Sequence, residues 1–202
     1  GGVSSGTGNN LDNVIKGSVY DNTLRGMAGN DKIYGNSGAD TIDGGEGNDY
    51  LSGGTENDVL FGDLGNHTVY GDTGDDTLYG EDGNDLMRGG EGNDVLRGDL
   101  GDDNMQGDNG ADFLYGGEGA DTMDAGAGND VMSGDSGADR MHGGDGNDIV
   151  NGGLDSDFLY GDAGNDKLNG GSGWDVLYGG DGNDRLDGGS EVDNLYGGAG
   201  DD

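Results

Sequence analysis

The sequence predicts an all-β solenoid in which short parallel strands stack coil upon coil. A nine-residue period runs from Gly8 to the end of the chain without insertion or deletion, and the eighth position of every full unit is aliphatic. Nine residues match neither the 3.6-residue helical spacing nor a heptad. Glycine also fills two or three positions in nine, and each glycine would cost a helix about 1 kcal/mol.

Each unit is predicted to form a turn followed by a short strand. At positions seven to nine, the aliphatic eighth residue points inward and the residues on either side of it point outward, which is the two-residue period of a β-strand. The first six residues are expected to form the turn. Two units make one coil of 18 residues, in which the eighth-position side chains meet from opposite walls. About eleven coils spaced by about 4.8 Å would form a rod on the order of 50 Å long.

The two ends of the chain depart from the regular repeat. Residues 1–7 are expected to be a linker, and residues 8–25 to be degenerate capping repeats at the N-terminus, because terminal repeats of solenoids are often atypical. These two repeats replace the usual glycine and aspartate with Leu11, Tyr20, Asn13 and Asn22. Residues 26–202 are expected to be the main solenoid, truncated at its C-terminus because the last unit is a turn without a strand.

The composition is strongly acidic and poor in apolar residues. The chain has 52 Gly, no Pro, no Cys, 43 acidic and 8 basic residues, and a formal net charge of −35. Such chains are usually disordered, so a folded state needs a partner that supplies cohesion. The charge disfavours nucleic acid and anionic membrane surfaces as partners, and no apolar run is long enough for insertion into a membrane.

The repeated turns have the chemistry of a calcium site. The fullest copies are GGEGNDYLS at 44–52, GGEGNDVLR at 89–97, GGDGNDIVN at 143–151 and GGDGNDRLD at 179–187. Ca²⁺ takes six to eight hard oxygen ligands from carboxylates and carbonyls. Glycines allow the turn to aim carbonyls inward, and two stacked turns offer two aspartates to one ion. The pattern therefore predicts that calcium ions bind between turns.

The unit G-G-x-G-x-D-x-U-x, where U is aliphatic, resembles the RTX, or haemolysin-type, calcium-binding repeat over residues 8–202. The resemblance implies a right-handed parallel β-roll with ions between turns 18 residues apart. One turn would supply its second- and fourth-position carbonyls, the next its first- and third-position carbonyls, and both their sixth-position carboxylates. These aspartates are Asp31, Asp40, Asp49, Asp58, Asp76, Asp85, Asp94, Asp103, Asp112, Asp121, Asp130, Asp139, Asp148, Asp157, Asp166, Asp175, Asp184, Asp193 and Asp202.

The same resemblance implies carbonyl ligands and a number of sites. Representative carbonyl donors are Gly44, Gly45, Glu46 and Gly47, and Gly89, Gly90, Glu91 and Gly92. Turns from Gly26 onward form 18 stacked pairs, of which two contain His67 instead of aspartate, so about 16 calcium sites are expected. Sixteen ions would bring about 32 positive charges and nearly cancel the formal charge of the chain. A conformational penalty is expected where fourth-position glycine is replaced by Glu56, Asp155 and Glu191.

Other kinds of site are not indicated. No Ser, Cys or His stands in a nucleophile arrangement, and the EF-hand and phosphate-loop patterns are absent. His67 and His142 are far apart and lack an H-E-x-x-H pattern, so no zinc role is expected of them. The second- and third-position acids are predicted to form a solvated face rather than auxiliary ligands; examples are Asp72, Asp99, Glu46 and Glu118.

The expected function is calcium binding by a non-catalytic domain. The resemblance implies a secreted, extracellular bacterial domain, exported by type I secretion, that folds on calcium and serves as a structural and secretion-assisting module of a larger exoprotein. An alternative is an adhesion module that docks a partner domain or a second copy on an apolar outer wall, which would include Val59, Val95, Phe113, Val131 and Ile149. The β-propensity of an exposed strand is the favoured explanation of that wall.

Overall fold

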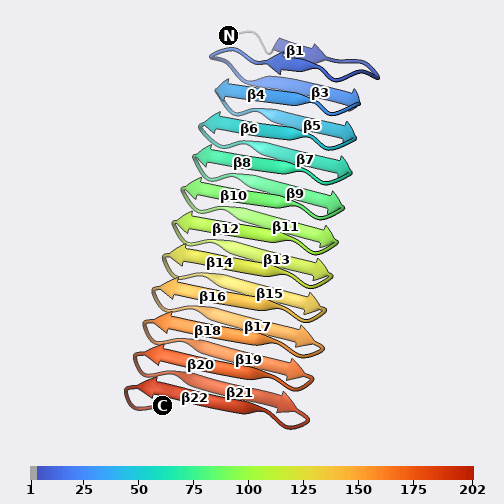
Figure 1. Ribbon diagram of the computed structural model, residues 1–202. Coiled ribbons are helices and arrows are strands. Elements are labelled where there is room, and N and C mark those ends of the chain that lie inside the picture. Colours follow the sequence, from blue (N-terminus) through green and yellow to red (C-terminus); the bar gives the residue numbers. More distant parts are fainter. Residues whose placement is uncertain (1–3) are drawn as a thin grey trace.

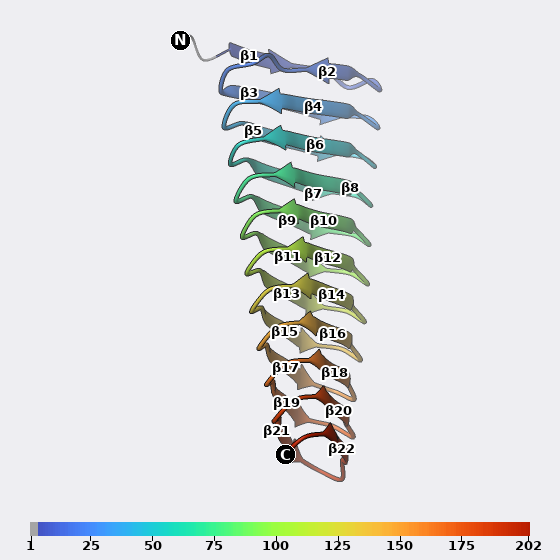
Figure 2. The ribbon, with the colours of Figure 1, turned by 90° about the vertical axis from the view of Figure 1, so that its left-hand side faces the viewer.

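The computed structural model describes residues 4–202, which form 22 strands and no helix. The strands build two parallel sheets of eleven strands each, one from the odd-numbered and one from the even-numbered strands (Figure 1). Each coil contributes one strand to each sheet, and consecutive coils are stacked along one axis (Figure 2). The predicted all-β solenoid of about eleven 18-residue coils is confirmed.

The odd sheet contains β1 (Ser4–Thr7), β3 (Asn22–Ala28), β5 (Thr41–Glu46), β7 (Val59–Leu64), β9 (Thr77–Asp82), β11 (Val95–Leu100), β13 (Phe113–Glu118), β15 (Val131–Ser136), β17 (Ile149–Leu154), β19 (Lys167–Ser172) and β21 (Arg185–Ser190). The even sheet contains β2 (Val14–Lys16), β4 (Lys32–Ser37), β6 (Tyr50–Thr55), β8 (Thr68–Thr73), β10 (Leu86–Glu91), β12 (Asn104–Asn109), β14 (Thr122–Ala127), β16 (Arg140–Asp145), β18 (Phe158–Ala163), β20 (Val176–Asp181) and β22 (Asn194–Ala199).

The strand register follows the sequence period without slippage. Leu78 in β9 pairs with Leu96 in β11, and Leu96 pairs with Leu114 in β13. A one-residue slip would move every eighth-position side chain to the outside, so the apolar pattern specifies this register strongly.

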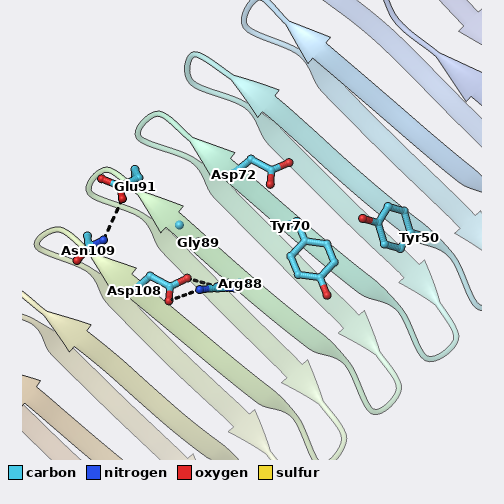
Figure 3. Close-up of a pocket in the computed structure, with 9 residues that line it drawn as sticks. Tyr50, Tyr70, Asp72, Arg88, Gly89, Glu91, Asp108 and Asn109 are labelled. Carbon is cyan, nitrogen blue, oxygen red and sulfur yellow. Dashed lines mark hydrogen bonds and ion pairs between the residues drawn. The ribbon is translucent and has the colours of Figure 1, made fainter.

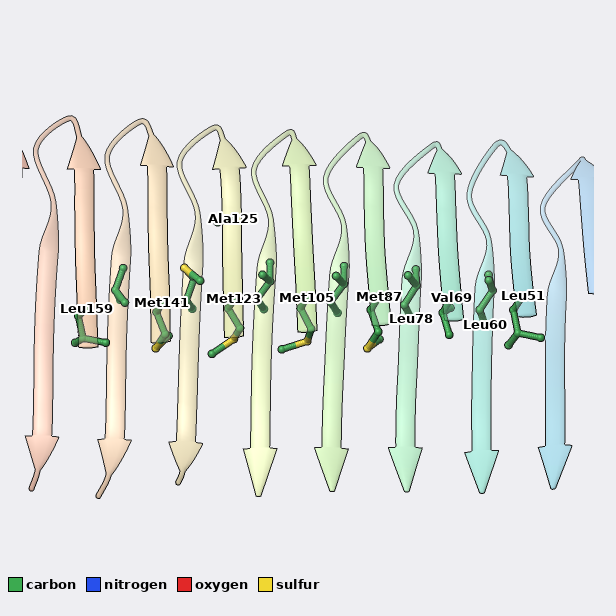
Figure 4. Close-up of a cluster of buried hydrophobic side chains, with 14 of the residues drawn as sticks. Leu51, Leu60, Val69, Leu78, Met87, Met105, Met123, Ala125, Met141 and Leu159 are labelled. Carbon is green, nitrogen blue, oxygen red and sulfur yellow. The ribbon is translucent and has the colours of Figure 1, made fainter. Parts of the chain in front are cut away.

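The core is a line of aliphatic side chains between the two sheets. Every eighth-position residue from Leu24 to Leu177 is at most 2% exposed. Figure 4 shows these side chains projecting into the space between opposing strands, with Met87, Met105 and Met123 contributed by neighbouring strands of the even sheet. Full burial of such a side chain contributes about 1.5–3 kcal/mol. One such residue in nine is a thin core, which leaves cohesion between coils to the backbone and the turns.

The strands are longer, and the turns shorter, than the sequence predicts. A typical strand has six residues, which are positions seven to nine of one unit and the first three positions of the next, as in β11. The expected six-residue turn is therefore reduced to three residues. The reason is that hydrogen bonding between coils continues through the glycine-rich segment: the Gly101 N–H still donates to the Glu118 carbonyl at 2.8 Å.

The first coil begins inside the segment expected to be a linker. Residues 4–7 form β1, which pairs in parallel with β3 from Ser4 opposite Asn22 to Thr7 opposite Arg25. Residues 1–3 of that expected linker lie outside the described residues. The boundaries of the capping repeats and of the main solenoid remain predictions.

Candidate metal centre

The turns stack along the two edges of the solenoid, and the sixth-position residue of each turn forms a column at each edge. One column, the Asp40 edge, contains Asn22, Asp40, Asp58, Asp76, Asp94, Asp112, Asp130, Asp148, Asp166, Asp184 and Asp202. The other column, the Asp31 edge, contains Asn13, Asp31, Asp49, His67, Asp85, Asp103, Asp121, Asp139, Asp157, Asp175 and Asp193. The aspartates from Asp31 to Asp184 are all buried, which is unusual for charged side chains.

One carboxylate oxygen of each aspartate holds the preceding coil. The Asp76 N–H donates to Oδ1 of Asp94 at 2.8 Å, and the Asp94 N–H donates to Oδ1 of Asp112 at 2.7 Å. The same bond recurs every 18 residues on both edges, as far as the Asp184 N–H donating to Asp202. These bonds fix the side-chain orientation, and so they also fix where the second oxygen lies.

The second oxygen, Oδ2, is buried without a hydrogen-bond partner in every one of these aspartates from Asp31 to Asp184. Burial raises the pKa of Asp94 to about 6 and that of Asp58 to about 7, although the N–H from the preceding coil acts to lower it. Because the pKa is raised, a coil without cations is more stable when its carboxyls are neutral. It loses stability as the pH rises from the ordinary aspartate value of 3.8 to about 7. At neutral pH the ionised columns therefore require positive charge.

Backbone carbonyls converge on the same space beside the first-position glycines. A β-carbon placed on Gly71 would lie 2.5 Å from Oδ2 of Asp76 and 2.7 Å from the carbonyl oxygen of Gly89 in the next coil. The carboxylate oxygen and the carbonyl oxygen thus border the same small space beside Gly71. This space, the cradle, would be filled by any side chain at that position. This arrangement explains why glycine occupies the first position of every repeat except the one that begins with Ala125, since a hard cation there would be surrounded by oxygen atoms.

The second and fourth positions favour glycine for a different reason. Gly90 and Gly92 have φ angles of 119° and 135°, in the left-handed region that glycine enters without a steric penalty. Aspartate, asparagine or glutamate at these positions adopts the same conformation, as Asp72 does with φ of 75°. Beyond the first two repeats, three residues replace fourth-position glycine, and all three have φ between 72° and 76°: Glu56, Asp155 and Glu191. Their turns therefore keep the shape of the others, with a local conformational cost.

The donor set fits a calcium ion. Between residues 4 and 202 no point brings together three or more His, Cys, Asp or Glu side chains. An ion between two turns would therefore take at most two carboxylates and draw its remaining ligands from carbonyls. An all-oxygen set with few charges suits Ca²⁺, whereas zinc prefers nitrogen and sulfur ligands.

His67 interrupts the Asp31 edge. Its side chain is buried, and its Nδ1 accepts the Asp49 N–H at 3.2 Å, the bond that Oδ1 of an aspartate makes elsewhere. Burial lowers the pKa of the imidazole, and the Asp63 carbonyl partly opposes that shift. Nε2 has no partner with hydrogen-bond geometry. The ring thus replaces a carboxylate without bringing its negative charge.

The structure adds a column of hydrogen bonds at the fifth position that the sequence analysis missed. Oδ1 of Asn48 accepts the Asn66 N–H at 2.9 Å, and Oδ1 of Asn147 accepts the Asn165 N–H at 2.9 Å. These bonds run in the opposite direction along the axis to those of the aspartates. The frequency of Asn and Asp at the fifth position was the signal in the sequence. It could not be interpreted without knowing which backbone N–H of the next coil lies beside that side chain.

The outer face of the even sheet carries aromatic and ion-paired side chains. His142, Tyr160, Tyr178 and Tyr196 stack in sequence, with ring centroids 4.2, 5.0 and 4.8 Å apart. A shallow depression of about 350 Å³ lies nearer the N-terminus, and in it Arg88 forms an ion pair with Asp108 beside Tyr70 (Figure 3). Its other two charged side chains accept hydrogen bonds from neutral groups, Asp72 from Ser52 and Glu91 from Asn109, and the residues lining it include no nucleophile with an adjacent base.

Comparison with known families places the whole repeat region in one group. The family described as the RTX calcium-binding nonapeptide repeat matches residues 7–42, 34–69, 68–96, 97–132, 133–168 and 169–202. No curated protein matched the chain. A helix long and apolar enough to cross a membrane does not occur in the described part of the chain.

Proposed function

Because this chain belongs to the RTX calcium-binding nonapeptide repeat family, whose repeats bind calcium, we propose that the sixth-position aspartates are its calcium ligands. The observation that carries the proposal is the two columns of buried Oδ2 atoms without partners, most of them beside a carbonyl of the next coil. An RTX β-roll is a structural domain without catalysis of its own. Any enzymatic activity would belong to other parts of a larger protein.

Each ion would bind between two turns on the same edge. The turns 71–76 and 89–94 offer the complete set, which includes the carboxylates of Asp76 and Asp94. The turns 44–49 and 62–67 offer one carboxylate, from Asp49, because His67 occupies the second position. About 16 complete sites follow from this rule. Their ions would balance most of the formal charge of −35 and join each coil to the next.

Calcium is therefore expected to drive folding. Without it, ionised carboxylates spaced by one coil repel one another along both edges, and the thin aliphatic core does not compensate. Circular dichroism should show β-structure in millimolar CaCl₂ and a largely unfolded chain in EDTA. Magnesium at the same concentration is the control, because Mg²⁺ demands octahedral geometry and retains its waters. Equal β-content in EDTA and in CaCl₂ would refute calcium-driven folding.

RTX repeats are typical of secreted bacterial proteins. The proposed role of this chain is a structural and secretion-assisting module of a larger exoprotein, exported by type I secretion while unfolded. Extracellular calcium-binding modules have Kd values of about 10⁻⁴–10⁻³ M, which prevents filling in a low-calcium cytosol. The calcium midpoint for folding should fall in that range. A midpoint near about 10⁻⁷ M would mean that the chain folds before export and would contradict this role.

A second candidate function is docking through the outer face of the odd sheet. Four neighbouring strands of the odd sheet, from β11 to β17, carry an apolar residue in the same register: Val95, Phe113, Val131 and Ile149. The side chains of Phe113 and Ile149 are 42% and 45% exposed. The expected occupant is a second copy or a partner domain. Phe113→Ser and Val95→Ser should weaken self-association measured by sedimentation velocity in CaCl₂, with calcium uptake unchanged. A wild-type chain that stays monomeric at all concentrations excludes the second copy.

A further inference from the structure

His67 is the one residue between Asp31 and Asp202 that breaks the run of sixth-position aspartates. Its ring lies where the carboxylate lies in the other turns. A β-carbon placed on Gly62 would be 2.6 Å from Cδ2 of His67 and 2.5 Å from the Gly80 carbonyl oxygen. The equivalent distances from Gly71 are 2.5 Å to Oδ2 of Asp76 and 2.7 Å to the Gly89 carbonyl oxygen. Cδ2 therefore replaces the carboxylate oxygen that faces the cradle, and carbon cannot ligate a cation.

The hydrogen bond to Nδ1 determines which ring nitrogen carries the proton. Nδ1 accepts the Asp49 N–H and must have a free lone pair, so the proton of the neutral ring is on Nε2. A metal ion on Nε2 would require the proton to move to Nδ1, where it would face the N–H of Asp49 as a second donor. The site thus opposes coordination of zinc or nickel as well as calcium.

Both neighbours of His67 keep the carboxylate arrangement of the other turns. Oδ1 of Asp85 accepts the His67 N–H at 2.7 Å, and its Oδ2 is buried without a partner. Oδ2 of Asp49 is likewise unpartnered and lies 3.8 Å from Nδ1 of His67. Each of these aspartates can therefore share an ion only with the neighbour on its other side, which is Asp31 for Asp49 and Asp103 for Asp85.

From this geometry we infer that His67 divides the Asp31 edge into two calcium ladders that fill independently, one formed by Asp31 and Asp49 and the other running from Asp85 to Asp193. The inference rests on the proposed function of the aspartates. The Asp40 edge has no such break and forms a single ladder. Each interior aspartate is shared by two neighbouring calcium sites, so filling one site affects the next along an unbroken ladder. The imidazole of His67 interrupts this coupling at the fourth coil, on the Asp31 edge only.

The first test counts the ions. Calcium bound to the folded chain is measured by equilibrium dialysis for the wild type, His67→Asp, His67→Asn and His142→Asp. His67→Asp should bind two more ions than the wild type, because it completes the sites with Asp49 and Asp85. His67→Asn keeps an acceptor for the Asp49 N–H without the charge, and His142→Asp adds the same charge on the outer face, so both should match the wild type.

The second test measures coupling between the two ladders. Hydrogen exchange at increasing calcium should protect two segments of the Asp31 edge, the turns before His67 and the turns after it, at separate calcium concentrations in the wild type, whereas the turns of the unbroken Asp40 edge should become protected together. The two segments should become protected together in His67→Asp. An unchanged ion count in His67→Asp overturns the inference, and so does zinc or nickel binding that is lost in His67→Asn. A wild-type chain that binds no calcium would instead refute the proposed function itself.

Discussion

The first turns of the solenoid and its interior turns solve the same hydrogen-bonding problem with different side chains. In the turn 17–22, Oδ1 of Asn22 accepts the Ser18 N–H of its own turn at 2.6 Å, while its Nδ2 donates to Oγ of Ser4 at 2.6 Å. In the turn 89–94, Oδ1 of Asp94 accepts an N–H from the preceding coil, and Oδ2 has no partner. The asparagine is satisfied by protein atoms alone, whereas the aspartate is not.

This difference indicates what the sixth position selects. A neutral amide both donates and accepts, so it can close a turn in the first coils without any ion. A carboxylate in the same place has one oxygen left over and a charge that burial disfavours. The change from Asn13 and Asn22 to the aspartates that follow therefore supports the prediction that residues 8–25 cap a calcium-dependent solenoid.

The largest effect is expected when interior turns are given the neutral amide side chain of the first two turns. The triple variant Asp76→Asn, Asp94→Asn, Asp112→Asn keeps each Oδ1 acceptor and removes three charges from consecutive turns of the Asp40 edge. Four adjacent sites are then affected, of which the outer two lose one carboxylate and the inner two lose both, so up to four ions should be lost. The free energy of unfolding in CaCl₂ should fall by about 3–5 kcal/mol, as when one partner of a buried charged pair is removed. Urea denaturation and calcium dialysis measure the two effects.

The matched control removes three acids that are exposed. Glu46→Gln, Glu91→Gln and Asp145→Asn change the net charge by the same amount at third-position residues, outside the buried columns. This control should keep the wild-type ion count and lose little stability. If both triple variants behave alike, the total charge matters and the buried columns do not.

A smaller effect is expected from filling one cradle with a methyl group. In Gly71→Ala the new Cβ would meet both Oδ2 of Asp76 and the Gly89 carbonyl, so the variant should be destabilised by about 1–3 kcal/mol. The chain contains one natural alanine at this position, the buried Ala125. Ala125→Gly should shift the melting temperature in CaCl₂ upward while Gly71→Ala shifts it downward. Shifts of the same sign would contradict the steric account of the cradle.

The smallest expected effect is at the cap. Asn22→Ala removes the bonds to Ser18 and Ser4, which should cost about 1 kcal/mol and loosen β1 against β3. The number of bound calcium ions should not change, because Asn22 supplies no charge. Hydrogen exchange should increase in residues 4–28 and remain unchanged beyond residue 80. Loss of a bound ion in this variant would show that the cap also ligates calcium.

Most of the fold and the identity of the candidate ligands could be predicted because a strict period decides which residues stack. Leu78, Leu96 and Leu114 lie in one column for the same reason that Asp76, Asp94 and Asp112 do: they are 18 residues apart, which is one coil. The strand ends could not be predicted, because glycine in the first positions suggested a turn. In the structure those glycines belong to the strands, since their neighbours still form backbone hydrogen bonds with the next coil.

The length of the coil, the aliphatic line inside it and the two acidic columns at its edges follow from the repeat alone, because each depends on position within the repeat. How each carboxylate is used follows from the packing of one coil on the next. An amide one coil away binds Oδ1 and leaves Oδ2 for a cation, and at His67 the same amide binds Nδ1 and turns carbon toward the cradle. That division depends on the distance between atoms of neighbouring coils, which no pattern within a single repeat contains.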